Sequence, residues 1–175
     1  NVACDFLLNL NLSGVRGGLV VVVCDDPSGI SSTNEQDTRL FARMGELPLL
    51  EPSSFQEAKD MTREAFGLSQ KLGLPVLLHS VTRLSHARGN VTLGPLPTLS
   101  PTPSFDRSRP FVNVPAPANA HRRLKKKIKR CRALFEASPH NWYEGPSRPE
   151  VIMVTTGAGL FYCLEGRDVL DLNER

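Results

Sequence analysis

Gly17-Gly-Leu-Val-Val-Val-Val-Cys-Asp-Asp-Pro27 is the stretch that decides the fold of this chain. Its apolar run, Leu19 to Cys24, is dominated by valine and is typical of a strand buried on both faces of a parallel sheet. Two glycines before the run and Asp25-Asp26-Pro27 after it mark the ends of the strand. Cys24 is therefore expected to be a buried thiol. The run is also far too short to cross a membrane.

Strands and helices are expected to alternate on both sides of this run. Further strands are predicted over 47–50 and 74–79, and helices over the opening residues, over 34–43 and after Ser54. The last of these helices has the clearest signals, because Ser54 and Glu57 fit a capping box and Gly73 is a natural stop. Apolar residues spaced by three and four give it one buried face. This alternation predicts an α/β fold with a parallel sheet.

The chain changes character after residue 94. Seven of its fourteen prolines lie between residues 94 and 117, which favours an extended connector over a helix. A helix is expected over 118–137, then a strand over 151–154 and a helix from Ala158 onwards. We therefore predict three parts: a first domain over 1–94, a proline-rich linker with a connector helix over 95–150, and the start of a second α/β domain over 151–175.

The connector helix concentrates positive charge in one segment. Residues 122–132 hold eight basic residues and no acidic one, so the net charge of +3 becomes −5 when these eight are removed. Leu124, Ile128, Cys131 and Phe135 give the same helix an apolar stripe, which favours a packed amphipathic helix with a solvated basic face. Phosphate binding by the basic face remains an alternative. Nucleic acid is not favoured, because no aromatic residue interrupts the basic run.

The four cysteines, Cys4, Cys24, Cys131 and Cys163, stand far apart and form no C-x-x-C pair. This spacing argues against an iron–sulfur or zinc site formed within the chain, so no metal site is predicted here. It favours a reducing, cytoplasmic compartment.

Polar residues cluster just after the first strand, where ligands bind in open parallel sheets. From position alone, one interpretation is that the following residues are polar groups lining a ligand pocket: Asp25, Asp26, Asn34, Glu35, Gln36 and Asp37. The alternative is that they are turn formers and helix caps, because Asp-Asp-Pro-Ser and Ser-Ser-Thr-Asn are good turn chemistry.

Three ordered stretches resemble a known family. They are Asp25-Asp26-Pro27 with Ser31-Ser32 and Asn34 to Arg39, Leu50 to Met61, and Thr82-Arg83 with Ser85-His86 and Arg88-Gly89. Together they resemble the pyrimidine-binding domain of thiamine-diphosphate-dependent 2-oxoacid:ferredoxin oxidoreductases, in the branch of the indolepyruvate enzyme's large subunit. The resemblance is strong over 1–94 and weaker over 110–165.

The resemblance implies an activity for an intact protein. An aryl 2-oxoacid, with indolepyruvate favoured, would be oxidatively decarboxylated to its acyl-CoA using thiamine diphosphate with Mg, and electrons would pass through 4Fe-4S clusters to ferredoxin. A smaller partner subunit and coenzyme A are also implied. The resemblance further implies that Asp25, Asp26 and residues 34–37 line or support the cofactor and substrate cleft. Pyruvate-using relatives place an Arg at about Asp25, so the acidic residue argues against pyruvate.

Parts of that machinery are not expected in this chain. The family's activating Glu lies upstream of the segment matched by Asn1, and Glu35 belongs to a different motif, so no catalytic residue is assigned. The magnesium ligands and the cluster cysteines lie downstream. We therefore expect a segment that is inactive alone, with an incomplete pyrimidine-domain fold. Two alternatives stay open: a non-catalytic binding module that uses the basic helix 122–132, and a degenerate gene product with an exposed sheet edge.

Overall fold

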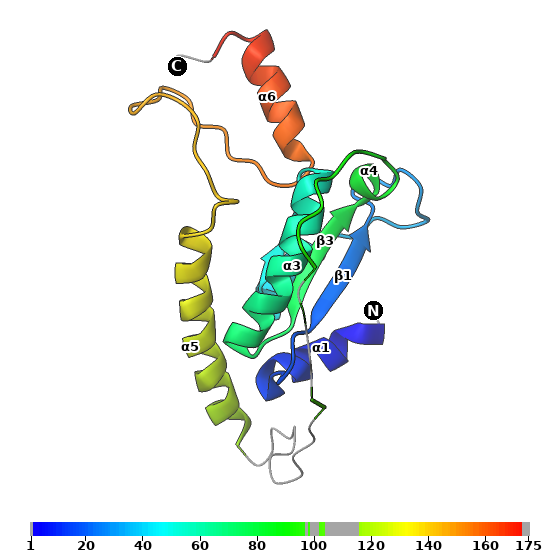
Figure 1. The fold of residues 1–175 in the computed structure, drawn as a ribbon, viewed down its shortest axis with the longest axis vertical. Helices are drawn as coiled ribbons and strands as arrows, with labels where there is room; N and C mark the ends of the chain where they lie inside the picture. Colours follow the sequence, from blue (N-terminus) through cyan, green and yellow to red (C-terminus); the bar gives the residue numbers. More distant parts are fainter. Residues whose placement is uncertain (1, 97, 99–101, 104–115, 173–175) are drawn as a thin grey trace.

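A three-stranded parallel sheet with helices on both faces forms the body of the molecule (Figure 1). The computed structural model describes residues 2–96, 98, 102–103 and 116–172. The elements, in chain order, are α1 (Val2–Ser13), β1 (Val20–Asp25), α2 (Thr38–Met44), β2 (Leu49–Leu50), α3 (Phe55–Leu72), β3 (Val76–Val81), α4 (Thr82–Ser85), α5 (Pro117–Glu136) and α6 (Gly159–Val169). Within these described ranges, every helix is too short or too polar to cross a membrane. The α/β class and parallel sheet expected from the sequence are confirmed.

The strand order is β1-β3-β2, so β3 is central and both other strands are edges of the described sheet. Residues 76–79 of β3 are buried on both faces. In β1, by contrast, Val22 is 59% exposed and the thiol-bearing residue Cys24 is exposed. The predictions of a doubly buried first strand and a buried Cys24 are therefore wrong. The physical reason is that helix α3 covers β3 and leaves this face of β1 open.

Helix α3 begins and ends where its local sequence predicts. The Ser54 hydroxyl accepts a hydrogen bond from the backbone N–H of Glu57, and Gly73 ends the helix in the left-handed conformation with φ 60°. The Glu57 carboxylate completes the cap one residue further back than in a capping box, because it accepts the N–H and hydroxyl of Ser53. Met61, Ala65 and Leu72 lie on the buried face.

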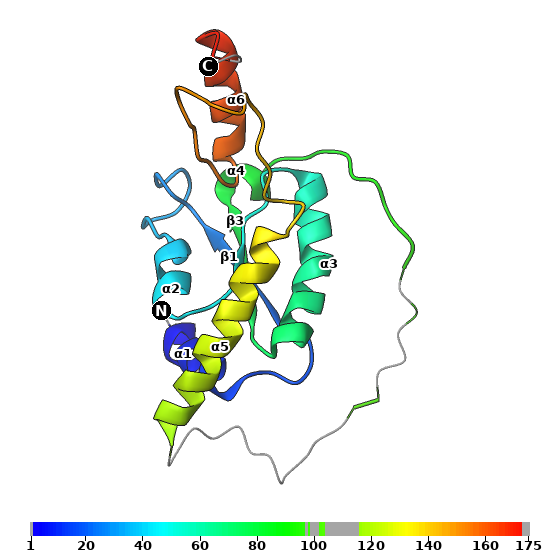
Figure 2. The same cartoon turned by 90° about the vertical axis from the view of Figure 1, so that its left-hand side faces the viewer.

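Helices α2 and α3 lie on opposite faces of the sheet (Figure 2). On the α2 face, Leu7 of α1, Ala42 of α2 and Leu77 of β3 form one core cluster together with Leu47. Helix α2 begins at Thr38, four residues later than predicted, because Asp37 caps it by accepting the backbone N–H of Arg39.

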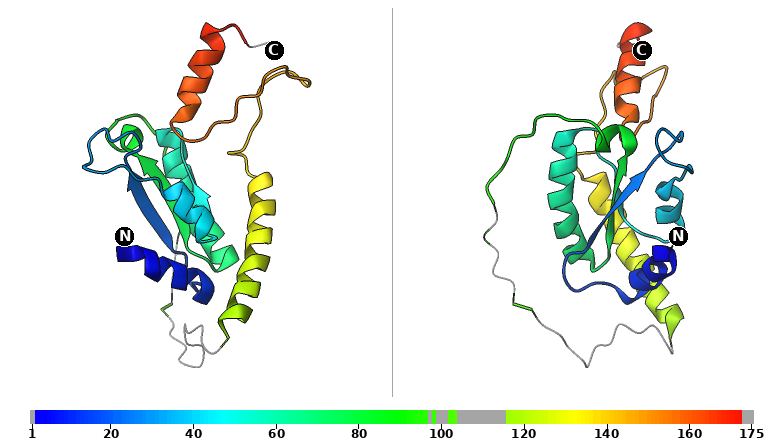
Figure 3. Two further views of the ribbon diagram at one scale, coloured as in Figure 1. Left: turned by 180° about the vertical axis from the view of Figure 1, so that it is seen from behind. Right: turned by 90° about the vertical axis from the view of Figure 1, so that its right-hand side faces the viewer.

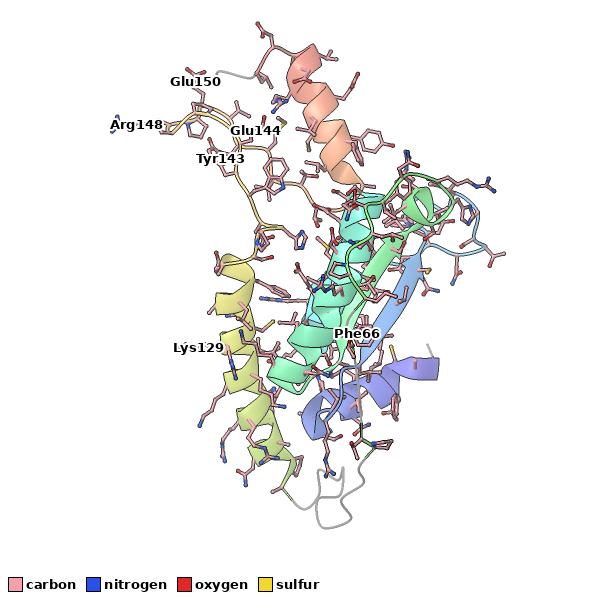
Figure 4. All side chains as sticks on the ribbon, in the orientation of Figure 1. Phe66, Lys129, Tyr143, Glu144, Arg148 and Glu150 are labelled. Carbon is pink, nitrogen blue, oxygen red and sulfur yellow. The ribbon has the colours of Figure 1, made fainter. Side chains whose placement is uncertain are left out.

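Helix α5 packs by its apolar stripe, as its spacing predicts. Leu124 and Cys131 are buried against Leu72 and Leu74, and Ile128 packs at the edge of the same cluster. The ammonium of Lys127 turns inward and donates a hydrogen bond to the carbonyl of Gly73 at 2.8 Å. Lys129 lies on the outer side of the helix, so the remaining basic face meets solvent (Figure 4). Most of the proline-rich stretch before α5 lies outside the described residues.

The segment after α5 leaves the body of the molecule. Arg148 and Glu150 lie at the tip of a loop that projects away from the sheet (Figure 4). The strand predicted over 151–154 does not form, since no described strand pairs with it, and Val154 is 91% exposed. The helix predicted after Ala158 is present as α6, beyond the carboxyl ends of the strands, whereas α1 lies at the opposite end of the sheet (Figure 3).

Candidate functional site

Each strand of the sheet brings one ionisable side chain to the same face. Val23 of β1 pairs with His79 of β3, and side chains alternate along a strand, so Asp25 and His79 share a face. On the other side of β3, Leu49 pairs with Leu77, and Glu51 follows two residues later on that face. The β-sheet register thereby gathers three ionisable groups at its carboxyl end.

His79 is the centre of this cluster and is fully buried. Its Nε2 lies 2.9 Å from Oδ2 of Asp25, and its Nδ1 lies 3.3 Å from Oε1 of Glu51, where the geometry falls short of a hydrogen bond. Burial alone would lower the pKa of His79, but the carboxylates of Glu51 and Asp25 outweigh it, and the pKa is raised. The arrangement therefore favours an imidazolium between two carboxylates.

Asp25 links the end of β1 to the start of α2. Its carboxylate accepts the backbone N–H of Thr38 at 2.6 Å and the Thr38 hydroxyl at 3.0 Å, besides the contact with His79. The Thr38 N–H belongs to the first turn of α2, where it has no partner within the helix. Asp25 is thus a buried tie between β1, β3 and α2, and its oxygens are committed to protein groups.

Asp26 shapes the turn that follows β1. Its Oδ2 accepts the backbone N–H groups of Ser31 and Ser32 at 2.5 and 2.7 Å. The Thr82 hydroxyl and these amides hold the pKa of Asp26 well below its ordinary value, although its Oδ1 makes no hydrogen bond of good geometry. Asp26 is buried. The carboxylate is therefore a stable anion that organises a loop.

Asp37, Arg39 and Glu51 extend the charge network toward solvent. The Arg39 guanidinium donates from Nε to Asp37 Oδ1 at 2.8 Å and from Nη2 to Asp37 Oδ2 at 3.0 Å. This pairing lowers the pKa of Asp37 and raises that of Arg39. Nη1 of Arg39 also lies 3.8 Å from Oε1 of Glu51. The network thus runs without interruption from Asp37 to the buried His79.

The six residues expected to line a cleft fall into two groups. Asp25 and Asp26 are buried anchors. The run 34–37 is exposed, and within it Glu35 accepts the backbone N–H of Ser28 while Asp37 caps α2. The contacts that these residues make are those of turn formers and helix caps, which is the alternative interpretation. Their role toward a ligand stays a prediction.

Two clefts open near the carboxyl end of the sheet. The smaller, of about 540 Å³, lies between the strand ends and the start of α6 and is lined in part by Ile30, Arg39, Glu51, Thr82, Arg83 and Tyr162. The larger, of about 920 Å³, lies between α3, the loop after α5 and α6, and includes Trp142, Met153 and Arg167. The smaller cleft occupies the position where open parallel sheets bind ligands.

One group of side chains has the composition of a metal site. Ligand-type atoms of Asp25, Asp37 and His79 lie within 4.8 Å of one another. His79 is already hydrogen-bonded to Asp25, however, and Asp37 is held by Arg39. A cation would have to displace both contacts and sit beside a guanidinium, so the group is better explained as an ion-pair network.

His79 was not among the residues predicted for the site. A usable signal was present in the alternation of each strand. An apolar residue followed two positions later by an ionisable one, as in Val23 and Asp25, Leu77 and His79, or Leu49 and Glu51, marks polar groups on one face at a strand end.

Comparisons with known proteins identify relatives of the chain, although no family profile and no solved structure matches it. Indolepyruvate oxidoreductase subunit IorA of Pyrococcus abyssi is 44% identical over 172 residues, covering 94% of this chain and 26% of the relative. The subunit of the same name from Archaeoglobus fulgidus is 42% identical over 178 residues, covering 99% and 28%. That of Methanothermobacter thermautotrophicus is 43% identical over 176 residues, covering 98% and 28%.

The fold is that of an α/β segment with a cleft at the carboxyl end of its parallel sheet. The relatives confirm the resemblance inferred from the sequence: the chain is homologous to one segment of the indolepyruvate oxidoreductase IorA subunits. It spans about a quarter of the length of the curated relatives it matches.

Proposed function

We propose that this chain is part of a larger oxidoreductase subunit that oxidatively decarboxylates an aryl 2-oxoacid, with indolepyruvate as the favoured substrate, to its acyl-CoA. Thiamine diphosphate with Mg, 4Fe-4S clusters, coenzyme A, ferredoxin and a smaller partner subunit belong to this proposal for the intact protein in the cytoplasm. The observation that carries it is the similarity of nearly the whole chain to six subunits named for indolepyruvate oxidoreductase.

We propose that this segment does not hold thiamine diphosphate by itself. Asp25 is committed to Thr38 and His79, and Glu51 faces His79 and Arg39. A carboxylate that activates the aminopyrimidine ring has to be free to hydrogen-bond it. Asp25 and Glu51 are instead committed to protein groups. Because the resemblance places the activating Glu elsewhere in the intact protein, we propose that the segment alone is inactive.

The contribution of this segment is to build one wall of the cleft. The Asp25–His79–Glu51 cluster fixes the ends of all three strands, and Glu51 also accepts a long hydrogen bond of 3.4 Å from the hydroxyl of Thr156. A rigid wall holds substrate-facing groups in a fixed position, and correct positioning of the reacting groups lowers the barrier to reaction.

The test is an activity measurement on the intact subunit that contains this segment, expressed with its partner subunit. Reduction of a viologen dye is followed with indolepyruvate, phenylpyruvate and pyruvate, with and without coenzyme A and thiamine diphosphate, and the acyl-CoA product is identified by mass spectrometry. The proposal expects reduction that depends on both additions and prefers the aryl substrates. Absence of reduction with every 2-oxoacid, in a preparation containing cofactor and clusters, would refute it.

A further inference from the structure

The smaller cleft contains two cationic side chains among its described lining residues, Arg39 and Arg83. A 2-oxoacid carries a carboxylate, and a planar guanidinium is the group best matched to a carboxylate. The two arginines differ, however, in how much of their charge is already used.

Arg39 is engaged by protein carboxylates. Asp37 takes two of its N–H donors at 2.8 and 3.0 Å, and Glu51 lies 3.8 Å from a third nitrogen. Two anions against one cation leave little positive potential for a ligand. Arg39 therefore balances the wall of the cleft, and its role is structural.

The charge of Arg83, unlike that of Arg39, is not balanced by a neighbouring carboxylate of the described residues. The side chain is exposed, and no carboxylate of the described residues forms an ion pair with it. Its guanidinium carbon lies over the ring of Tyr162, 5.2 Å from the ring centroid. A cation over a ring is attracted by the ring's negative face, and the N–H groups of its guanidinium can still donate to an anion.

The same cleft offers apolar surface beside this cation. Ile30 and Tyr162 are 52% and 58% exposed, and Val154 is 91% exposed, and all three line the cleft. A cation next to apolar and aromatic surface matches a ligand with a carboxylate at one end and an aromatic ring at the other. Asp25 is itself acidic and is buried beside His79, so it does not bind the carboxylate of a ligand.

We propose that Arg83 binds the carboxylate of an aryl 2-oxoacid in this cleft and that Tyr162 and Ile30 receive the aromatic ring. The substrate class rests on the proposed function, whereas the assignment of Arg83 rests on the charge balance and stacking of the cleft. Helix α4, which carries Arg83, follows β3 directly, so the position of the guanidinium is tied to the central strand.

The first experiment measures ligand binding to the 175-residue chain by NMR titration. The probes are indole-3-pyruvate, its methyl ester, pyruvate and inorganic pyrophosphate. Indole-3-pyruvate should bind most tightly, because the ester lacks the charge and pyruvate lacks the ring. Pyrophosphate separates an aryl carboxylate site from a phosphate site, and equal or tighter binding of pyrophosphate would overturn the proposal.

Variants then assign the cation. R83Q should weaken indole-3-pyruvate binding by roughly tenfold to a hundredfold, the effect of losing a charged hydrogen bond. R83K should fall between, because it keeps the charge and loses the planar fork. R88Q is the matched control, because Arg88 is exposed on the same stretch and does not line the cleft. The R88Q variant should bind indole-3-pyruvate as tightly as the unchanged chain does. All variants are checked for the same thermal midpoint.

Unchanged affinity in R83Q, or no binding of indole-3-pyruvate by the unchanged chain at millimolar concentrations, would overturn the assignment. A second arm separates this result from failure of the proposed function. In the intact complex, R83Q should raise the KM for indolepyruvate with a smaller change in kcat. Activity with an unchanged KM would reject Arg83 and leave the proposed function standing, whereas binding through Arg83 without any turnover would reject the proposed function alone.

Discussion

Oδ2 of Asp25 lies 2.9 Å from Nε2 of His79, which follows it by 54 residues, and both side chains are almost completely buried. The contact joins the end of edge strand β1 to the central strand β3. The same carboxylate holds the first N–H of α2 through Thr38. One buried ion pair therefore fixes three elements at the end of the sheet where the cleft opens.

Replacing Asp25 by Ala should destabilise the chain strongly. The change leaves His79 and the Thr38 N–H without their partner in a buried site, and removal of one member of a buried pair costs about 3–5 kcal/mol. D37A is the matched control, because Asp37 is an exposed cap whose loss costs about 1 kcal/mol. Urea denaturation compares the two variants. A D25A midpoint equal to that of D37A would contradict the proposed role of Asp25.

The charge on His79 predicts how stability varies with pH. Because the pKa of His79 is raised in the folded chain, its ion pairs stabilise the fold fully below the unfolded-state pKa of about 6.5. This contribution is lost as pH rises through the higher folded-state pKa. The difference in free energy of unfolding between the unchanged chain and H79Q should therefore shrink as pH rises above about 6.5 and through the higher folded-state pKa. A difference that grows with pH would show that His79 is neutral when folded.

A side chain at position 157 should destabilise the turn before α6. The glycine at this position has a φ of +55°, and a Cβ added there would lie 2.5 Å from Oε1 of Glu51, which His79 and Arg39 restrain. G157A should therefore destabilise the turn by about 1–3 kcal/mol, as expected for a non-glycine residue held in this conformation. Hydrogen exchange of the first amides of α6 measures the loss of protection.

The control for G157A is G166A within α6. A Cβ at Gly166 meets nothing within 4 Å, so alanine there should stabilise the helix by about 0.5–1 kcal/mol. If both substitutions lower the protection of α6 equally, the contact between Gly157 and Glu51 is not the cause.

The ends of α3 were predicted well because their signals are local. The burial of the strands and the composition of the site were predicted less well, because they depend on contacts between distant parts of the chain. Ser54 and Gly73 act through hydrogen bonds within their own turns, so the sequence contains the whole cause. The valine run of β1 and the run of β3 look alike as sequences, but only the strand order puts β3 in the centre. The predicted strand over 151–154 did not form, because its own sequence does not show whether a neighbouring strand is available to pair with it. His79 became a site residue only once the register placed it beside Asp25 and Glu51.

The open face of β1 makes a final prediction about thiol chemistry. Cys24 is exposed on this face, whereas Cys131 is buried between α5 and the end of α3, where burial raises the pKa of its thiol to about 11. Iodoacetamide at pH 8 should alkylate Cys24 within minutes and leave Cys131 unmodified until urea unfolds the chain, because only an accessible thiolate reacts. Peptide mass spectrometry over time identifies each site, and C24S controls for the assignment. Alkylation of Cys131 as fast as Cys24 in the folded chain would mean that α5 does not stay packed on Leu72 and Leu74, and protection of Cys24 would mean that this face of β1 is covered.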